Sequence, residues 1–193
     1  MNIPPETRIE DITFTFLDVE TTGLSPERER ICEVAIISFR DFKQVYSFST
    51  LINPQKKIPP EITRINGIND EMVKDKPAFP AAVPKIMVAL ENSVVVGHNV
   101  NFDRDFLVSE FSRCGFQMPS LHFVDTLLIA RKFGKFSNNR LGNIARQLEI
   151  SNENWHRALS DVEMTSKIFE HFMVIFKKEG VNSLHDLLKK LKE

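Results

Sequence analysis

Cysteine, glycine and long apolar runs are scarce in this sequence of 193 residues, and each shortage excludes a class of protein. The two cysteines, Cys32 and Cys114, are too few for a disulfide framework or a four-thiolate zinc site, and their apolar surroundings predict buried thiols. With 7 glycines and 10 prolines, the collagen-like and low-complexity classes are excluded. No uninterrupted apolar run exceeds five residues, whereas a membrane-spanning helix needs about 20. We therefore predict no membrane span.

Length and composition are those of a folded globular protein, with 42% apolar and 26% charged residues. We expect one domain over residues 1–193, with a core of about 12–178 and a C-terminal helix of about 183–191. The N-terminus, MNIPPETRIEDI, carries acids and prolines where a signal peptide needs a basic start and an apolar stretch. The expected location is therefore cytoplasmic.

The formal net charge of −1 does not indicate a polyanionic partner, but the charge is unevenly distributed. Residues 131–157 hold six basic residues and two acidic ones. A solvated helical face explains this surplus, and so does contact with a nucleic-acid backbone. The second explanation gains weight if phosphodiester chemistry is found nearby.

Hydrophobic periodicity predicts a mixed α/β fold. Alternation over residues 12–20 indicates a strand, and the β-rich runs 31–39 and 45–52 follow closely enough to form an antiparallel three-stranded meander with it. The following segments alternate between helix and strand, which implies parallel crossovers. The expected helices are 80–91, 101–114, 126–132 and 141–148, and the expected strands are 94–97 and 121–124.

Two helices are predicted after these. Ala158, Val162, Thr165, Phe169, Phe172 and Phe176 are spaced 4, 3, 4, 3 and 4 residues apart, which is the apolar stripe of a long helix. A final amphipathic helix over 183–191 either packs on the long helix or binds a partner.

Two carboxylates end the first predicted strand. Because side chains alternate along a strand, Asp18 and Glu20 emerge side by side from the face that also carries Phe14 and Phe16. At an effective dielectric of about 20, two carboxylates about 4 Å apart repel by about 4 kcal/mol. A positive group must therefore lie between them, either a basic side chain or a cation.

Asp103 and Asp161 extend this group of acids. Asp103 begins a helix directly after the buried strand 94–97, at the strand end where open α/β sheets bind ligands. Asp105 would point about 200° away from it on the helix and is the weaker candidate. Asp161 lies in the first turns of the long helix. Stabilisation of a helix N-terminus explains either acid taken alone.

His156 precedes Asp161 by five residues. Five helical residues rotate by about 140°, so both side chains face one site only if His156 precedes the helix. A surface histidine is the alternative.

Three segments together resemble the three motifs of the DEDDh, or DnaQ-like, 3′–5′ exonucleases, and especially the proofreading epsilon-subunit group of bacterial DNA polymerase III. They are FLDVETTGL at 16–24, GHNVNFDRDFL at 97–107 and HRALSD at 156–161. The resemblance, which spans about residues 12–175, implies a ribonuclease H-like fold with a mixed five-stranded sheet and metal-dependent hydrolysis of nucleic acid from the 3′ end. It assigns Asp18, Glu20, Asp103 and Asp161 to the metal ions and His156 to the general base.

The resemblance also implies a set of substrate contacts. Residues 58–68 are similar to the loop that holds the terminal nucleotide in relatives, although Asn66 stands where histidine is more usual. Leu24 occupies the family's wedge position and is expected to pack on the terminal base. Asp125 also looks familial, but it precedes a helix and is interpreted as its N-cap. The expected substrate-binding residues are Thr21, Leu24, Glu61, Gly67, Ile68, His98, Asn99 and Phe102.

The chemistry of phosphodiester cleavage suits these residues. Two metal ions about 3.5–4 Å apart can activate water and stabilise the leaving 3′ oxygen. Oxygen ligands favour Mg²⁺ or Mn²⁺, and histidine, with an ordinary pKa near 6.5, can accept the water's proton. We therefore predict a two-metal 3′–5′ exonuclease that takes the 3′ end of a single strand, favouring DNA proofreading, with a DNA polymerase catalytic subunit as a suggested partner.

Three other functions stay open. An RNA-directed 3′–5′ exonuclease would use the same motifs, as would another metal-dependent phosphohydrolase. The third is a non-catalytic module that binds nucleic acid or a polymerase. No G-x-x-x-x-G-K-[ST] stretch is present, which disfavours P-loop chemistry.

Overall fold

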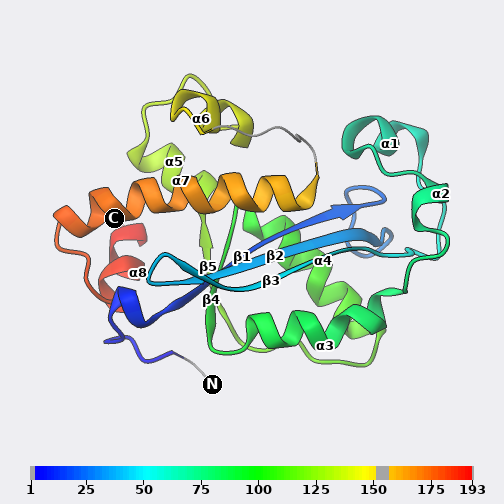
Figure 1. The fold of residues 1–193 in the computed structure, drawn as a ribbon, viewed down its shortest axis with the longest axis horizontal. Coiled ribbons are helices and arrows are strands. Elements are labelled where there is room, and N and C mark those ends of the chain that lie inside the picture. Colours follow the sequence, from blue (N-terminus) through cyan, green and yellow to red (C-terminus); the bar gives the residue numbers. More distant parts are fainter. Residues whose placement is uncertain (1–2, 151–156, 193) are drawn as a thin grey trace.

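A five-stranded mixed sheet forms the centre of the molecule, in a computed structural model that describes residues 3–150 and 157–192. The strand order is β3-β2-β1-β4-β5, with antiparallel pairs β1–β2 and β2–β3 and parallel pairs β1–β4 and β4–β5 (Figure 1). The predicted fold class, a mixed sheet built from a meander and parallel strands, is therefore confirmed. The strands are β1 (Thr13–Thr21), β2 (Ile31–Arg40), β3 (Lys43–Leu51), β4 (Ser93–Gly97) and β5 (His122–Asp125).

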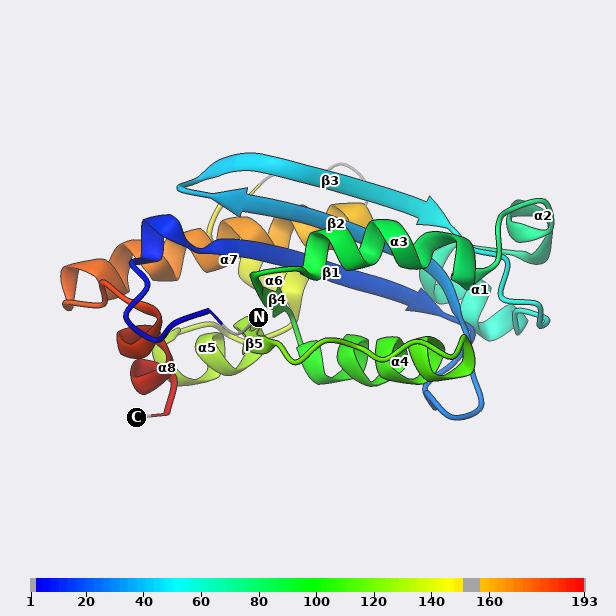
Figure 2. The same cartoon turned by 90° about the horizontal axis from the view of Figure 1, so that it is seen from below.

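Helices cover both faces of the sheet. The long helix α7 packs on one face, with α5 and α6 against it, and α3 and α4 pack on the other face (Figure 2). These helices are α3 (Phe79–Leu90), α4 (Val100–Arg113), α5 (Thr126–Phe133), α6 (Leu141–Gln147) and α7 (Ala158–Lys178).

Alternation along β1 decides which side chains face α7. Phe14 and Phe16 point toward α7, where their ring centroids lie 4.9 and 5.5 Å from that of Phe169. Leu17 and Val19 point to the other face and join the second core cluster. The same alternation places Asp18 and Glu20, further along β1, on the α7 face. The predicted apolar stripe of α7 is buried throughout, as expected.

Residues 60–73 differ from the prediction. Residues 58–68 were expected to form a loop, but α1 (Pro60–Asn66) forms within them; α2 (Asp70–Val73), for which no element was predicted, follows, and both lie beyond the end of β1 (Figure 1). Pro60 occupies a first-turn position of α1, and Gly67 ends it in the left-handed conformation at φ 73°. Proline is favoured in the first turn of a helix and glycine just past its end, so the sequence did contain signals for the bounds of α1.

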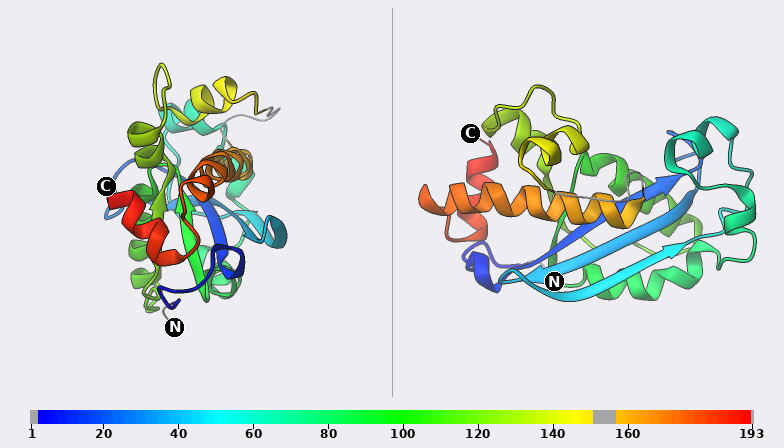
Figure 3. Two further views of the ribbon diagram at one scale, coloured as in Figure 1. Left: turned by 90° about the vertical axis from the view of Figure 1, so that its left-hand side faces the viewer. Right: turned by 45° about the horizontal axis from the view of Figure 1, so that its top comes forward.

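The segment before β1 lies beside the start of the last helix (Figure 3), where Ile9 N donates to the Asn182 carbonyl and Leu184 N donates to the Thr7 carbonyl. A 3₁₀ helix, η1 (Ile9–Asp11), precedes β1, and the last helix is α8 (Leu184–Lys192). Leu184 and Leu187 are fully buried in the core. Helix α8 therefore packs within the chain, which was one of the two alternatives that the sequence left open. Among the described residues, no helix is long and apolar enough to cross a membrane. Cys32 is buried as predicted, whereas Cys114 is only half-buried because it follows the last turn of α4.

Candidate active site

Three carboxylates converge where β1 ends and α7 begins. Asp18, Glu20 and Asp161 each place one carboxylate oxygen within 4.8 Å of the others. Asp18 and Glu20 come from the same face of β1, and Asp161 lies in the first turn of α7. A break in the β1–β2 register directly after Glu20 ends the regular pairing at this point. Residues far apart in the sequence thus present an all-oxygen donor set.

Asp103 lies beside this cluster, on the first turn of α4. It is buried, and its Oδ1 accepts a hydrogen bond of 3.0 Å from the backbone N–H of Val19. That bond fixes Asp103 between the positions of Asp18 and Glu20 on β1. Asp105 is exposed and pairs with Arg104. This agrees with the prediction that it points away from the site.

Hydrogen bonds to Asp125 hold the turn before α4 in place. Asn99 adopts the left-handed conformation at φ 70°, and its N–H donates to Asp125 Oδ1 at 2.9 Å. The same oxygen accepts from Leu127 N at 2.8 Å, so the predicted N-cap role of Asp125 is confirmed. Asp125 therefore joins the starts of α4 and α5.

Burial shifts the acids toward their protonated forms. It raises the pKa of Asp18 well above its usual value, and the charge of Asp103 adds to the shift. Burial raises the pKa of Glu20 to about 7, although a hydrogen bond from the Asn66 side chain opposes the shift. It raises the pKa of Asp103 to about 8, against the opposing hydrogen bond from Val19. Three buried acids with raised pKa values, next to Asp161, favour a divalent cation as the compensating charge.

In the described part of the chain, no basic side chain forms an ion pair with three of the acids, although the charge of Arg157 lowers the pKa of Glu20 from a distance. Within residues 3–150 and 157–192, no ion pair includes Asp18, Glu20 or Asp103. Arg157, at the N-cap of α7, instead pairs with Glu33 on β2. Neutralisation by arginine or lysine, the alternative left open by the sequence, is therefore not observed for these three carboxylates.

Two site residues were missed by sequence reasoning. Asn66 is buried at the end of α1, reaches the Glu20 carboxylate and accepts from Ile68 N at 3.0 Å. Glu33 is buried directly opposite Glu20. An acid within the apolar run of β2 was a visible signal for Glu33, whereas the contact of Asn66 depends on how α1 folds back toward β1.

Some of the expected substrate-binding residues are exposed or half-buried, and their contact with substrate stays a prediction. Leu24 is 82% exposed in the loop after β1. Phe102 is half-buried on α4, with its ring centroid 4.9 Å from that of Phe106. Glu61 and Gly67 are exposed on α1 and at its end.

Other expected contacts are already engaged within the chain. The ring nitrogens of His98 lie 2.9 Å from Thr126 Oγ1 and 2.9 Å from the Asn139 carbonyl oxygen. The Thr21 hydroxyl donates to the carbonyl of Gly23 at 2.6 Å. Ile68 is fully buried in a small apolar cluster. These three side chains thus have partners within the chain, and their contact with substrate stays a prediction. His156, the expected general base, lies outside the described residues.

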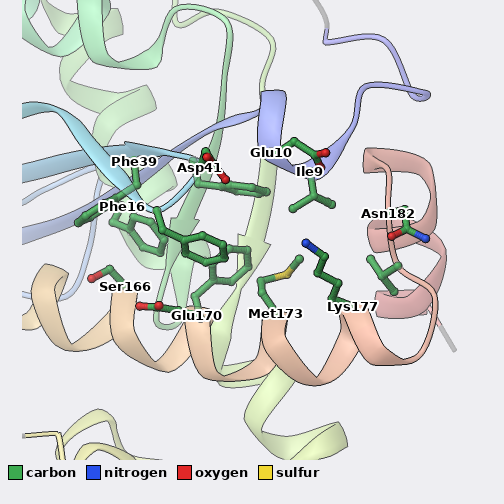
Figure 4. Close-up of a pocket in the computed structure, with 14 residues that line it drawn as sticks. Ile9, Glu10, Phe16, Phe39, Asp41, Ser166, Glu170, Met173, Lys177 and Asn182 are labelled. Carbon is green, nitrogen blue, oxygen red and sulfur yellow. The ribbon is translucent and has the colours of Figure 1, made fainter.

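An apolar groove runs along the same side of the sheet, at the other end of β1 (Figure 4). Phe16, Phe39 and Met173 line it, with Glu10 and Glu170 among its polar residues. None of the four clustered acids belongs to this groove. The acid site and the groove are therefore separate features.

Known proteins share this sequence pattern. A family model described as Exonuclease (RNase_T) matches residues 15–169. DNA polymerase III subunit epsilon of Treponema pallidum is 37% identical over 83% of this chain and 76% of its own length. The 3′-5′ exonuclease DinG of Bacillus subtilis is 34% identical over 81% of this chain, and a PolC-type DNA polymerase III of Thermotoga petrophila is 32% identical over 96%. The chain spans only 17% and 14% of those two relatives.

Solved structures share the fold. Exonuclease X in complex with 5′ overhanging duplex DNA has a TM-score of 0.69 at 24% identity, covering 84% of this chain and 92% of that one. E. coli Exonuclease I in complex with a dT13 oligonucleotide has a TM-score of 0.74 at 21% identity, covering 85% and 41%. The ribonuclease H-like fold implied by the motifs is thus confirmed. With the family model covering most of its length, the chain belongs to the exonuclease family that its three motifs resemble.

Proposed function

We propose that this chain is a metal-dependent 3′–5′ exonuclease that removes nucleotides from the 3′ end of a nucleic-acid strand. The convergence of Asp18, Glu20 and Asp161 within 4.8 Å, with Asp103 beside them, carries the proposal. The family membership and the relatives named as 3′-5′ exonuclease and epsilon subunit support it. We propose that residues 1–193 form a single exonuclease domain, with a core of about 12–178, and that it acts in the cytoplasm.

The donor set fits hard divalent cations. All four proposed ligands are carboxylates, and burial raises the pKa values of Asp18, Glu20 and Asp103, so that a bound cation would stabilise their charged forms. We propose two Mg²⁺ or Mn²⁺ ions held by Asp18, Glu20, Asp103 and Asp161. Such ions supply activation of the attacking water and stabilisation of the leaving 3′ oxygen.

The remaining roles belong to the chain itself. His156 is proposed as the general base, since a metal-held water still needs a proton acceptor. Leu24 and Phe102 are proposed to contact the terminal base, because both offer apolar surface beside the acids. Glu61, Gly67 and Asn99 complete the proposed substrate contacts.

DNA is the proposed substrate, because the relatives include an epsilon subunit and PolC-type polymerases and the structural neighbours include DNA complexes. A DNA polymerase catalytic subunit is the proposed partner on the same ground. Four cations of the basic segment, Arg131, Lys135, Arg140 and Arg146, are exposed on and around α5 and α6. They are available for backbone contacts, whereas Arg157 is paired with Glu33.

The test is degradation of matched DNA and RNA strands, 5′-end-labelled, single and duplex, with Mn²⁺ or with EDTA. A one-nucleotide ladder on DNA that requires Mn²⁺ and disappears in Asp18→Ala is the expected result. Asp105→Ala, in which an exposed neighbour of the site is changed, should keep the ladder. An active Asp18→Ala enzyme would refute the metal assignment, and faster loss of RNA would favour the RNA-directed alternative. Binding without any cleavage would favour the non-catalytic module.

A further inference from the structure

Glu33, a buried acid next to the proposed metal site, forms an ion pair with the half-buried Arg157, and neither residue belongs to the proposed ligand set. The Glu33 carboxylate is 97% buried and accepts from Arg157 Nη2 at 2.6 Å and Nε at 3.2 Å. Its second oxygen also accepts from the backbone N–H of Ala158 at 3.2 Å. One carboxylate on β2 thus binds both the N-cap residue of α7 and the first residue of the helix.

This arrangement replaces the usual cap of a helix. Arg157 makes no side-chain cap bond of its own, so a carboxylate from another element satisfies the first N–H of α7. A negative charge at this position also suits the positive end of the helix dipole. The start of α7 is therefore fixed to β2 by charge and by hydrogen bonds together.

The fixed point lies next to two of the clustered acids. Glu33 is directly opposite Glu20 in the β1–β2 register. The carbonyl of Arg157 accepts the N–H of Asp161 at 3.2 Å, in the first turn of α7. A shift at Glu33 or Arg157 is thus transmitted to Asp161 through one helical turn, while Glu20 stays on β1.

We infer that the Glu33–Arg157 pair positions Asp161 against Glu20 and thereby sets the affinity of the site for divalent cations. The inference rests on the proposed function, because it concerns the same carboxylates. Both residues are positioning residues: they hold a proposed ligand in place and do not contact the ion or the substrate. Removing the partners that orient metal ligands typically costs about 10- to 100-fold in metal affinity.

A second buried carboxylate, Glu110, offers a control, because it also binds an arginine and a backbone N–H, with Arg113 as a further partner at 3.5 Å. Glu110 on α4 is fully buried and accepts from Arg30 Nε at 2.7 Å and Nη2 at 3.1 Å. It also accepts from the backbone N–H of Ile31, the first residue of β2, at 3.2 Å. Glu110 lies two helical turns from Asp103, which has its own bond to Val19. Loss of the Glu110 pair should therefore cost stability without moving the acids.

The experiment compares Glu33→Gln, Arg157→Lys and Glu110→Gln with the wild-type chain. Mn²⁺ affinity is measured by calorimetry and by the Mn²⁺-dependent rise in Tm, and kcat and KM are measured on a single-stranded oligonucleotide. Glu33→Gln should weaken Mn²⁺ binding by about 10-fold or more, lower kcat at limiting Mn²⁺, recover at high Mn²⁺ and leave KM unchanged. Arg157→Lys keeps the positive charge but loses the planar guanidinium that binds both carboxylate oxygens. Its Mn²⁺ affinity should therefore lie between those of the wild type and Glu33→Gln. Glu110→Gln should lower Tm and keep the wild-type Mn²⁺ affinity.

Wild-type Mn²⁺ affinity in folded Glu33→Gln would overturn the inference, as would an equal loss in Glu110→Gln. If Glu33→Gln does not fold, as judged by circular dichroism, Arg157→Lys decides by the same criterion. Measurements on the wild-type protein distinguish a failure of this inference from a failure of the proposed function. Wild-type protein that binds Mn²⁺ without cleaving nucleic acid contradicts the exonuclease proposal, while the comparison of affinities still tests the positioning of Asp161.

Discussion

At the scale of single residues, the acid site is held in an electrostatically unfavourable state by the rest of the fold. Glu20 and Asp103, with pKa values of about 7 and about 8, bind more protons when folded than when unfolded, where acids titrate near 4. Proteins keep such groups at the expense of stability only where the surrounding structure over-determines them. A cation that neutralises the cluster would relieve this cost.

The pH dependence of stability should report this state. Because the folded-state pKa values are raised, the stability that protonation of these acids gives is present below about pH 4 and is lost as the pH rises through about 8. The Tm of the metal-free protein should therefore decrease as the pH rises from 5.5 to 8.5. The Tm of Asp103→Asn should decrease less steeply over the same range. Asp105→Asn, whose parent side chain is exposed, should follow the wild type. Thermal scans in EDTA would contradict this if Asp103→Asn fell as steeply as the wild type.

Leu24 should act on the substrate and not on stability. Its side chain is 82% exposed, so Leu24→Ala should leave Tm unchanged while it weakens binding of a single-stranded oligonucleotide by about 1–3 kcal/mol. Val88→Ala, in which a residue of similar exposure on α3 is changed, serves as the control and should bind as the wild type does. Fluorescence anisotropy with Ca²⁺ in place of Mg²⁺ would measure both. Unchanged affinity in Leu24→Ala would remove it from the contact set.

His156 should affect turnover and leave the metal in place. As the proposed general base, its loss in His156→Ala should lower kcat by about 10²- to 10⁴-fold. His171→Ala changes an exposed histidine of α7 and should keep the wild-type rate. Single-turnover kinetics with parallel Mn²⁺ calorimetry would measure both effects. If the His156→Ala change removed bound metal, His156 would belong to the ligand set.

At the scale of elements, periodicity predicted the strands and the larger helices because it follows which side chains face which part of the core. The stripe of α7 is its buried side, and the alternation in β1 separates the side chains that face α7 from those that join the second core cluster. Helix α1 is only seven residues long and has one buried residue, Asn66, so it offers no apolar period to detect. Its proline start and glycine end were the available signals, and only the packing of α1 shows that Asn66 reaches Glu20.

The contact between α7 and β1 should dominate stability at this scale. The Phe169 ring is nearly fully buried against Phe14 and Phe16, so Phe169→Ala should lower the free energy of unfolding by about 3–5 kcal/mol. Val174→Ala, on the exposed side of the same helix, should change it by less than about 1 kcal/mol. Urea denaturation at fixed pH compares the two. Equal losses would show that this interface does not carry the stability assigned to it.

At the scale of the whole molecule, three short motifs were sufficient to predict the family, because each carries acids that only a shared site brings together. The structure adds what linear motifs cannot contain. Glu33 and Arg157 are 124 positions apart in the sequence, and their pairing exists only once β2 and α7 are packed. Similarly, the engagement of His98 with Thr126 and Asn139 depends on the arrangement of three separate segments.

Four carboxylates at the end of β1 are proposed to hold a pair of divalent ions. Anomalous diffraction from crystals soaked in Mn²⁺ tests this proposal directly. Two manganese peaks about 3.5–4 Å apart are expected, ligated by oxygens of Asp18, Glu20, Asp103 and Asp161. A map without manganese at these residues, or with the four carboxylates paired to arginine or lysine side chains, would contradict it.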